Sequence, residues 1–145
     1  MDLLLRTADE ADAAFCEALN RRNMGGYLAR RGIDWDPGRF RASWDAFENL
    51  LILDGRDVVG LLRLASEDGA LGLRDLQVLP ARQGQGIGSW AVRQAQAIAV
   101  QRGHGRLQLR VYRENPAAAL YARLGFQLLS EVGDTLQMTW SPGSS

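Results

Sequence analysis

The chain has 145 residues, of which 46% are hydrophobic, so it is long enough to fold as one domain with a continuous core. Its 17 basic and 17 acidic side chains balance, which excludes a strong overall field that would draw the protein to nucleic acid or to an anionic membrane. Any anion-binding site must therefore be local. We expect a single domain over residues 1–145, with no nucleic acid and no membrane among its partners, and we assign no metal ligands.

The first residues contain no long apolar run with a positive flank, so we expect neither a signal peptide nor a membrane-spanning segment. The single cysteine, Cys16, cannot form an internal disulfide, which fits a reducing cytoplasm. The only histidine, His104, stands between two glycines in an expected turn. A buried structural thiol is therefore the favoured interpretation of Cys16, and a catalytic nucleophile is the alternative.

The first half of the chain predicts one strand, two helices and then three strands in a meander. Thr7 is placed to cap the first helix. The second helical region is less regular and gathers large side chains, so we expect it to cover one end of a sheet and leave a groove. In order, these elements cover residues 3–6, 8–20, 23–47, 50–53, 58–65 and 70–79.

The second half of the chain alternates helices with strands. After Pro80 the apolar period changes from two to about three and a half, which predicts a helix from Ile87 to about Gly103. A strand follows, and Asn115 then caps a helix that Pro116 begins and Gly125 ends. This strand, the helix and the last two strands cover residues 107–111, 116–124, 126–129 and 135–140. The whole order predicts a mixed α/β sheet with helices packed on it.

A glycine-rich turn connects the strand that ends near Leu79 with the helix that follows. Glycines at alternate positions lack Cβ atoms and let backbone N–H groups approach an anion, and the N-terminus of the helix adds its positive end. The sequence therefore predicts a phosphate cradle made of backbone. Its residues are Gln83, Gly84, Gln85, Gly86, Ile87, Gly88 and Ser89.

Two known phosphate-binding loops do not fit this turn. A P-loop needs a lysine and then Ser or Thr after its last glycine, but here Ser89 follows Gly88 directly. A dinucleotide fingerprint needs a third glycine where Ser89 stands and an acidic residue where Arg110 stands. An ordinary strand-to-helix turn without a ligand stays open as the alternative.

The turn does fit a third pattern, which is Gln or Arg, two residues, Gly, one residue, then Gly or Ala. In this it resembles the pyrophosphate loop of the GNAT N-acetyltransferases, and a second motif downstream agrees in order and spacing. The resemblance is close over residues 73–126, whereas over residues 1–64 it rests on the order of elements. The second motif consists of Leu107, Leu109, Val111, Asn115, Ala118, Leu120, Tyr121, Leu124, Gly125 and Phe126.

The resemblance implies a GNAT acyl-CoA N-acyltransferase fold, with a predominantly antiparallel sheet, helices on both faces and a splayed central strand pair. It implies acetyl-CoA as co-substrate, with the turn on its pyrophosphate and Asn115 in contact with it. The backbone of Leu76 and Val78 would pair with the pantetheine arm. A backbone N–H near Leu76 would polarise the thioester carbonyl.

Tyr121 stands at the position of the family's usual proton donor, where it would also contact the coenzyme. A phenol with an ordinary pKa of about 10 stays protonated at neutral pH and can protonate the departing thiolate. Simple packing of Tyr121 against Leu120 and Leu124 is the alternative.

No general base is assigned. Members of the family often carry Glu or His at the positions of Gly72 or Arg74, and neither of these residues can accept the proton of an amine. Asp75 is the nearest carboxylate in the sequence. We expect ordered water, or the amine's own equilibrium, to remove the proton.

The resemblance implies an acceptor that is a primary amine of a small molecule or of a protein, and residues 23–47 together with Arg74 are expected to line its groove. An inward-pointing Arg74 would favour an acceptor with a carboxylate or a phosphate. The large side chains of this segment are more often core than ligand-binding; they include Met24, Tyr27, Trp35 and Trp44.

Other functions stay open. The missing carboxylate at Gly72 favours a non-catalytic acyl-CoA sensor, whereas Tyr121 argues against it. A transferase for a longer acyl group and a protein-interaction domain with a fortuitous glycine turn are further alternatives. A homodimer also stays open.

Overall fold

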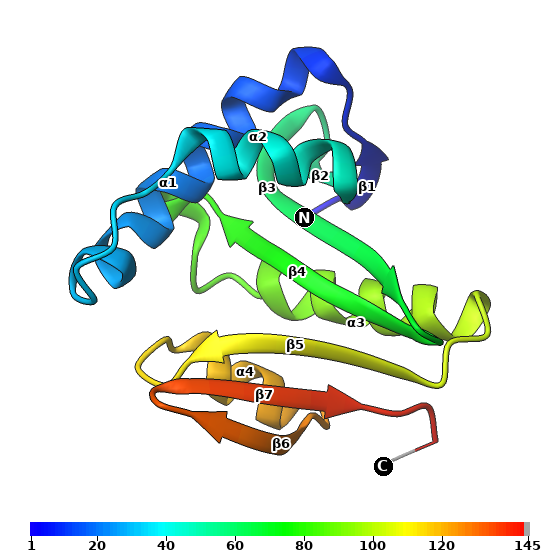
Figure 1. Ribbon diagram of the computed structural model, residues 1–145. Coiled ribbons are helices and arrows are strands. Elements are labelled where there is room, and N and C mark those ends of the chain that lie inside the picture. Colours follow the sequence, from blue (N-terminus) through cyan, green and yellow to red (C-terminus); the bar gives the residue numbers. More distant parts are fainter. Residues whose placement is uncertain (144–145) are drawn as a thin grey trace. The chain divides into compact units, whose positions relative to one another are not determined.

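The computed structural model describes residues 1–143. Within them, seven strands form one sheet in the order β1-β2-β3-β4-β5-β7-β6 (Figure 1). The strands are β1 (Leu3–Thr7), β2 (Glu48–Asp54), β3 (Asp57–Glu67), β4 (Ala70–Val78), β5 (Arg106–Tyr112), β6 (Gln127–Val132) and β7 (Thr135–Trp140). The helices are α1 (Ala13–Ala29), α2 (Pro37–Ala46), α3 (Ile87–Gln101) and α4 (Ala117–Arg123), with short 3-10 turns η1 (Glu10–Asp12) and η2 (Pro80–Arg82).

The chain divides into two compact units. The N-terminal unit consists of Met1–Arg63 and Asp75–Gly88, and the C-terminal unit consists of Leu64–Arg74 and the chain from Ser89 onward. The strands β3 and β4 contribute residues to both units. None of the helices within residues 1–143 is long and apolar enough to cross a bilayer.

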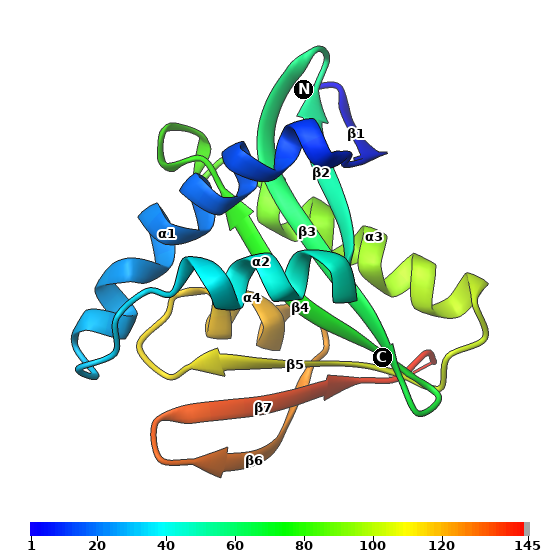
Figure 2. The ribbon, with the colours of Figure 1, turned by 45° about the horizontal axis from the view of Figure 1, so that its top comes forward.

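The N-terminal unit has its own apolar core. β1 pairs antiparallel with β2, from Leu3 opposite Asp54 to Thr7 opposite Leu50. α1 and α2 run beside each other over this part of the sheet (Figure 2). The core cluster consists of Ala13, Cys16, Leu19, Phe40, Trp44, Leu51, Leu53 and Leu61, with Trp35 packed against it.

Cys16 lies in this core with none of its surface exposed. Burial is the main reason that the pKa of its thiol rises to about 12. A thiol that stays protonated at neutral pH is a poor nucleophile. The expectation of a buried structural thiol is confirmed.

The start of α1 differs from the prediction. Thr7 is the last residue of β1, and the carboxylate of Asp9 instead accepts from the N–H of Ala11 at 2.9 Å. Asp12 accepts from the N–H of Asp9 at 3.0 Å and completes a capping box for η1, from which α1 continues. The predicted cap at Thr7 was therefore wrong, because a better acceptor stands two residues further on.

The division between the first two helices also differs. α1 runs to Ala29 and so takes in the first part of the predicted second helix, while α2 covers only Pro37–Ala46. Gly25 and Gly26 weaken a helix but do not break its hydrogen-bond ladder, as a proline would. α2 begins at Pro37, and proline suits the first position of a helix. Asp36 caps this helix, because its side chain accepts from the N–H groups of Gly38 and Arg39.

The C-terminal unit holds the parallel pair of the sheet. β4 pairs parallel with β5 over only three residues, Ala70–Gly72 against Arg106–Gln108. β5 then continues antiparallel with β7 as far as Tyr112, and β6 pairs antiparallel with β7. Leu73 and Arg74 follow on β4 without a partner in this ladder, so the two strands part after Gly72. The predicted mostly antiparallel sheet and its splayed pair are confirmed.

Helices α3 and α4 form as their sequences predict. The residues of α3 that are fully buried recur at helical spacing, namely Ile87, Ala91, Val92, Ala95 and Ala99. α4 is followed by Gly125 with φ +95°. A Cβ at Gly125 would lie 3.3 Å from the Trp140 ring, so a larger residue would be both strained and crowded there.

Candidate active site

The glycine turn of the N-terminal unit has an unusual backbone. Gly84 and Gly86 have φ angles of +79° and +87°, in the left-handed region that favours glycine. No atom lies within 4 Å of the place that a Cβ would take at either residue. Glycine is therefore needed here for the course of the backbone rather than for space.

This backbone leaves donors available. Within residues 1–143, the N–H groups of Gly84, Gln85 and Gly86 have no hydrogen-bond acceptor, and all three residues are exposed. Ile87 begins α3, whose first N–H groups lack partners inside the helix. Successive free N–H groups ahead of a helix N-terminus form a nest that can bind an anion.

Side chains hold the turn from both ends. Arg82 donates to Oε1 of Gln85 at 3.0 Å and to Asp54 at 2.5 Å. Nε2 of Gln83 donates to the carbonyl of Val78 at 3.1 Å. The turn is thus anchored to η2 and to the end of β4, and these contacts do not use the backbone N–H groups of Gly84, Gln85 and Gly86.

The end of β4 holds the two residues predicted to pair with the pantetheine arm, Leu76 and Val78, which are both half-buried. The carbonyl of Val78 accepts from Nδ2 of Asn23 at 3.0 Å as well as from Gln83. A carbonyl oxygen has two lone pairs, so these two hydrogen bonds occupy both acceptor positions of Val78. Pairing of a ligand with Val78 would therefore go through its N–H.

Asp75 lies in a buried polar network of the N-terminal unit, with 8% of its side chain exposed. Its carboxylate accepts from Asn20 at 2.6 Å, from Gln77 at 2.8 Å and from Arg63 at 3.4 Å. Both of its oxygens are engaged. Asp75 is therefore a structural acceptor in this network.

Arg63 is the cation of this network and was missed by the sequence reasoning. Its side chain is 3% exposed and donates to Asn49 at 2.9 Å and to Ser43. The guanidinium lies 4.4 Å from the Phe40 ring centre and 4.9 Å from that of Phe47. The available signal was an arginine inside an otherwise apolar strand, because such a residue must find partners when it is buried.

Asn115 and Tyr121 lie in the C-terminal unit. Oδ1 of Asn115 accepts from the N–H of Ala117 at 3.0 Å, which confirms its role as the cap of α4. Tyr121 is 6% exposed, and its ring centre lies 5.6 Å from that of Phe126. The phenol is thus held by packing on the inner side of α4.

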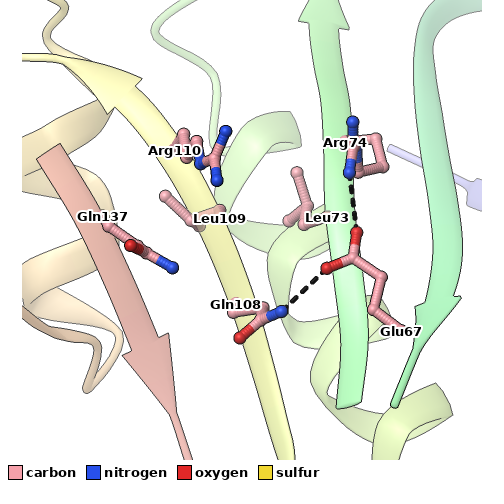
Figure 3. Close-up of a pocket in the computed structure, with 7 residues that line it drawn as sticks. All are labelled: Glu67, Leu73, Arg74, Gln108, Leu109, Arg110 and Gln137. Carbon is pink, nitrogen blue, oxygen red and sulfur yellow. Dashed lines mark hydrogen bonds and ion pairs between the residues drawn. The ribbon is translucent and has the colours of Figure 1, made fainter. Parts of the chain in front are cut away.

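A second feature of the C-terminal unit is a polar pocket of about 180 Å³. Figure 3 shows Glu67 reaching from the end of β3 toward Arg74 on β4 and Gln108 on β5. The pocket is lined by Glu67, Leu73, Arg74, Gln108, Leu109, Arg110 and Gln137. Of these residues, the sequence reasoning assigned a ligand-binding role only to Arg74.

Glu67 is the carboxylate of this pocket. One oxygen accepts from Arg74 and the other from Gln108, each at 2.7 Å. Burial raises the pKa of Glu67, but the hydrogen bonds from Arg74 and Gln108 and the nearby charges outweigh it, so the pKa falls below 4.5. Glu67 is therefore ionised at neutral pH and is a weak base.

Gly72 makes room for this carboxylate. A Cβ at Gly72 would lie 2.4 Å from Oε1 of Glu67. The volume that a side chain at residue 72 would fill is thus taken by the side chain of Glu67. The carboxylate at this place comes from Glu67 at the end of the neighbouring strand β3, and not from a side chain at residue 72, where the resemblance led us to look for it.

The predicted site residues divide between the two units. Leu76, Val78 and the turn up to Gly88 belong to the N-terminal unit, and Ser89, Asn115 and Tyr121 belong to the C-terminal unit. Their joint arrangement around one ligand stays a prediction.

Comparisons with known proteins bear on this pattern. The sequence profile of the acetyltransferase (GNAT) family matches residues 13–126. No curated protein sequence matches the chain significantly.

Solved structures match the fold over nearly the whole chain. A spermidine N-acetyltransferase from Vibrio cholerae, solved with CoA and spermine, has a TM-score of 0.81 at 18% identity and covers 99% of this chain and 97% of its own. The PaiA N-acetyltransferase from Thermoplasma acidophilum, solved with coenzyme A, has a TM-score of 0.77 at 17% identity, with 97% and 99% covered. The ribosomal-protein-S18-alanine N-acetyltransferase from Escherichia coli has a TM-score of 0.73 at 19% identity, with 96% and 93% covered.

Proposed function

The chain belongs to the acetyltransferase (GNAT) family, and we propose that it transfers the acetyl group of acetyl-CoA directly to a primary amine. The observation that carries this proposal is the exposed turn in which the N–H groups of Gly84, Gln85 and Gly86 have no acceptor among the described residues. Such donors ahead of α3 suit the pyrophosphate of the coenzyme. Two structural neighbours with the same fold were solved with coenzyme A bound.

In this proposal the turn from Gln83 to Ser89 binds the pyrophosphate, and the N–H groups of Leu76 and Val78 meet the pantetheine arm. Asn115 uses its Oδ1 to cap α4, which leaves its Nδ2 as the donor toward the coenzyme.

The reaction is a direct acyl transfer. The amine nitrogen attacks the thioester carbonyl carbon, and a backbone N–H near Leu76 stabilises the oxyanion that forms. The intermediate then collapses with cleavage of the C–S bond. The departing thiolate takes a proton from the hydroxyl of Tyr121, the nitrogen loses its proton to water and so becomes the amide, and the tyrosinate takes a proton back from water.

Water is the proposed proton acceptor because the protein offers no suitable base nearby. Gly72 has no side chain, Arg74 is a cation paired with Glu67, and both oxygens of Asp75 are engaged. The amine therefore enters as the free base or loses its proton to solvent.

A non-catalytic acyl-CoA sensor is the second candidate. Two observations favour it. Gly72 has no side chain and supplies no carboxylate, and the carboxylate of Glu67, which occupies the space beside Gly72, is ion-paired with Arg74. A transferase for a longer acyl group is a variant of the first proposal. Titration with acetyl-CoA and with longer acyl-CoA thioesters, followed by turnover with each, distinguishes these possibilities.

The decisive experiment measures thiol release from acetyl-CoA over a panel of amines. We expect release with the wild type, and a fall in kcat of about 100- to 10,000-fold in Tyr121→Phe, because general acid catalysis contributes factors of that size. The dissociation constant of acetyl-CoA should stay the same. Tyr112→Phe, which removes a phenol hydroxyl from β5, is the matched control and should keep its turnover.

Other outcomes decide between the candidates. Coenzyme binding without thiol release for any amine would favour the sensor. Absence of coenzyme binding would contradict both and leave the protein-interaction domain.

A further inference from the structure

The polar pocket lies where β4 and β5 part within the C-terminal unit. Their last paired residues are Gly72 and Gln108. Leu73 and Arg74 on one strand, and Leu109 and Arg110 on the other, come directly after this pair and line the pocket. In the proposed function the acetyl group is delivered where these strands open, so a ligand in the pocket lies beside the place of reaction.

The charges in the pocket do not balance. Two guanidinium groups and one carboxylate line it, which leaves a net charge of +1. Each oxygen of the Glu67 carboxylate accepts one hydrogen bond, from Arg74 and from Gln108. Arg110, in contrast, has no hydrogen-bond or ion-pair partner within the described part of the chain. The cation left over is therefore that of Arg110.

A neutral donor stands next to this cation. Gln137 on β7 is the cross-strand partner of Arg110 in the antiparallel ladder. Its Oε1 accepts from the hydroxyl of Ser130 at 3.1 Å, which leaves its Nε2 as a donor. Figure 3 shows the side chains of Arg110 and Gln137 on adjacent strands at the same pocket. The guanidinium of Arg110 and Nε2 of Gln137 together offer N–H donors that can bind an oxyanion.

The size and charge of the pocket limit its occupant. Its volume of about 180 Å³ is below the range of about 300–1,000 Å³ that holds whole drug-sized ligands. It therefore suits one small polar group of a larger ligand. The net charge of +1 matches a single carboxylate better than a doubly charged phosphate.

We propose that the acceptor is an amine that also carries a carboxylate, and that Arg110 and Gln137 bind this carboxylate. This inference rests on the proposed acetyl transfer and adds the substrate class to it. Glu67 and Arg74 form the opposite wall, where the ion pair keeps Arg74 in place and keeps the net charge at +1. Arg110 and Gln137 are specificity-determining residues in this account.

The test uses matched pairs of acceptors with acetyl-CoA. Each pair consists of an L-α-amino acid or ω-amino acid and its carboxamide, which differ only in the carboxylate. The amine of an α-amino amide is less basic than that of the acid, so at neutral pH this bias favours the amide. We expect the wild type to prefer the acid in kcat/KM in spite of this bias.

The variants are Arg110→Gln and, as the matched control, Arg93→Gln on the exposed side of α3. We expect Arg110→Gln to lower kcat/KM for the acids by about 10- to 100-fold, mainly through KM, because a charge-assisted hydrogen bond is lost. The amides should be used as before, and Arg93→Gln should behave as wild type. Equal use of acid and amide by the wild type, or no effect of Arg110→Gln, would overturn the proposal while leaving acetyl transfer intact.

A binding measurement separates this proposal from the proposed function. Calorimetric titration of N-acetylglycine and N-acetylglycinamide into the protein saturated with CoA reads the pocket without turnover. We expect N-acetylglycine to bind more tightly, and Arg110→Gln to abolish the difference. If no amine is acetylated but this preference is seen, the transferase fails and the carboxylate site stands; if amines are acetylated without this preference, the carboxylate site fails.

Discussion

Two of the arginine–carboxylate pairs of the molecule differ in burial and in the number of their further partners. Arg63 and Asp75 lie 3.4 Å apart and are 3% and 8% exposed, whereas Arg74 and Glu67 lie 2.7 Å apart and are 46% and 29% exposed. The longer contact belongs to the buried pair, which has further partners for both side chains. The shorter contact lies at an open pocket beside Arg110, a cation that has no hydrogen-bond or ion-pair partner within residues 1–143. A short distance is thus no sign of a structural role; the completeness of the surrounding hydrogen bonds is the better guide.

Asp75 and Arg74 are neighbours in the sequence, yet they belong to these two different pairs. Burial of Arg63 and Asp75 is tolerated because Asn20, Asn49 and Gln77 satisfy them. The open pair is screened by solvent and contributes little to stability. We infer that the first pair holds the N-terminal unit together and that the second keeps a charged pocket ready for a ligand.

The largest expected effect comes from breaking the buried pair. Arg63→Met leaves the carboxylate of Asp75 without its cation, and we expect the free energy of unfolding to fall by about 3–5 kcal/mol. Arg74→Met is the matched control at the open pair and should cost no more than about 1 kcal/mol. Urea unfolding of the three proteins measures both values, and equal losses would contradict the contrast drawn here.

A smaller loss is expected when Asp75 keeps its shape but loses its charge. Asp75→Asn should lower the free energy of unfolding by about 1–3 kcal/mol, because Arg63 loses a buried charged partner. Its pH–rate profile should have the same shape as that of the wild type. If the wild type showed an acidic limb that disappeared in Asp75→Asn, Asp75 would be the base and the proposed role of water would be wrong.

The smallest expected effect concerns Glu67 and is seen in the dependence of stability on pH. The pKa of Glu67 is lowered in the folded state by its bonds to Arg74 and Gln108. The folded state therefore favours the ionised form, so this stabilisation is present above pH 4.5 and is lost as the pH falls through the lowered pKa. Glu67→Gln should flatten the acid side of the stability curve.

Salt provides the control for this prediction. The difference between Glu67→Gln and the wild type should shrink at about 1 M salt, where charges are screened beyond a few ångströms. An unchanged acid limb in the variant would show that Glu67 is not held as an ion pair in solution.

The features that are determined by residues close together in the sequence could be predicted. Three such features are found where the sequence predicts them: the apolar period of α3, the cap at Asn115 and the glycine turn. The cap at Thr7 was wrong because two acceptors, Asp9 and Asp12, compete with it within one turn. The predicted end of the first helix at residue 20 was wrong, because α1 continues through Gly25 and Gly26 as far as Ala29.

The polar clusters could not be predicted, because their members come together only in the folded sheet. Glu67, Arg110 and Gln137 are far apart in the sequence and meet through strand pairing. Arg63 finds its partners on three other elements. The sequence reasoning looked for a base at Gly72 itself, whereas the carboxylate there comes from β3.

The most direct test of the account is a titration of ¹⁵N-labelled protein with CoA, followed through the backbone amide signals of Gly84, Gln85 and Gly86. Pantetheine, which lacks the pyrophosphate, is the comparison ligand. We predict that the three signals shift on saturation with CoA and stay unchanged with pantetheine, because their N–H groups then bind the diphosphate. If CoA binds and these signals do not move, or if CoA does not bind, the turn is not the coenzyme site and the proposed acetyl transfer loses its foundation.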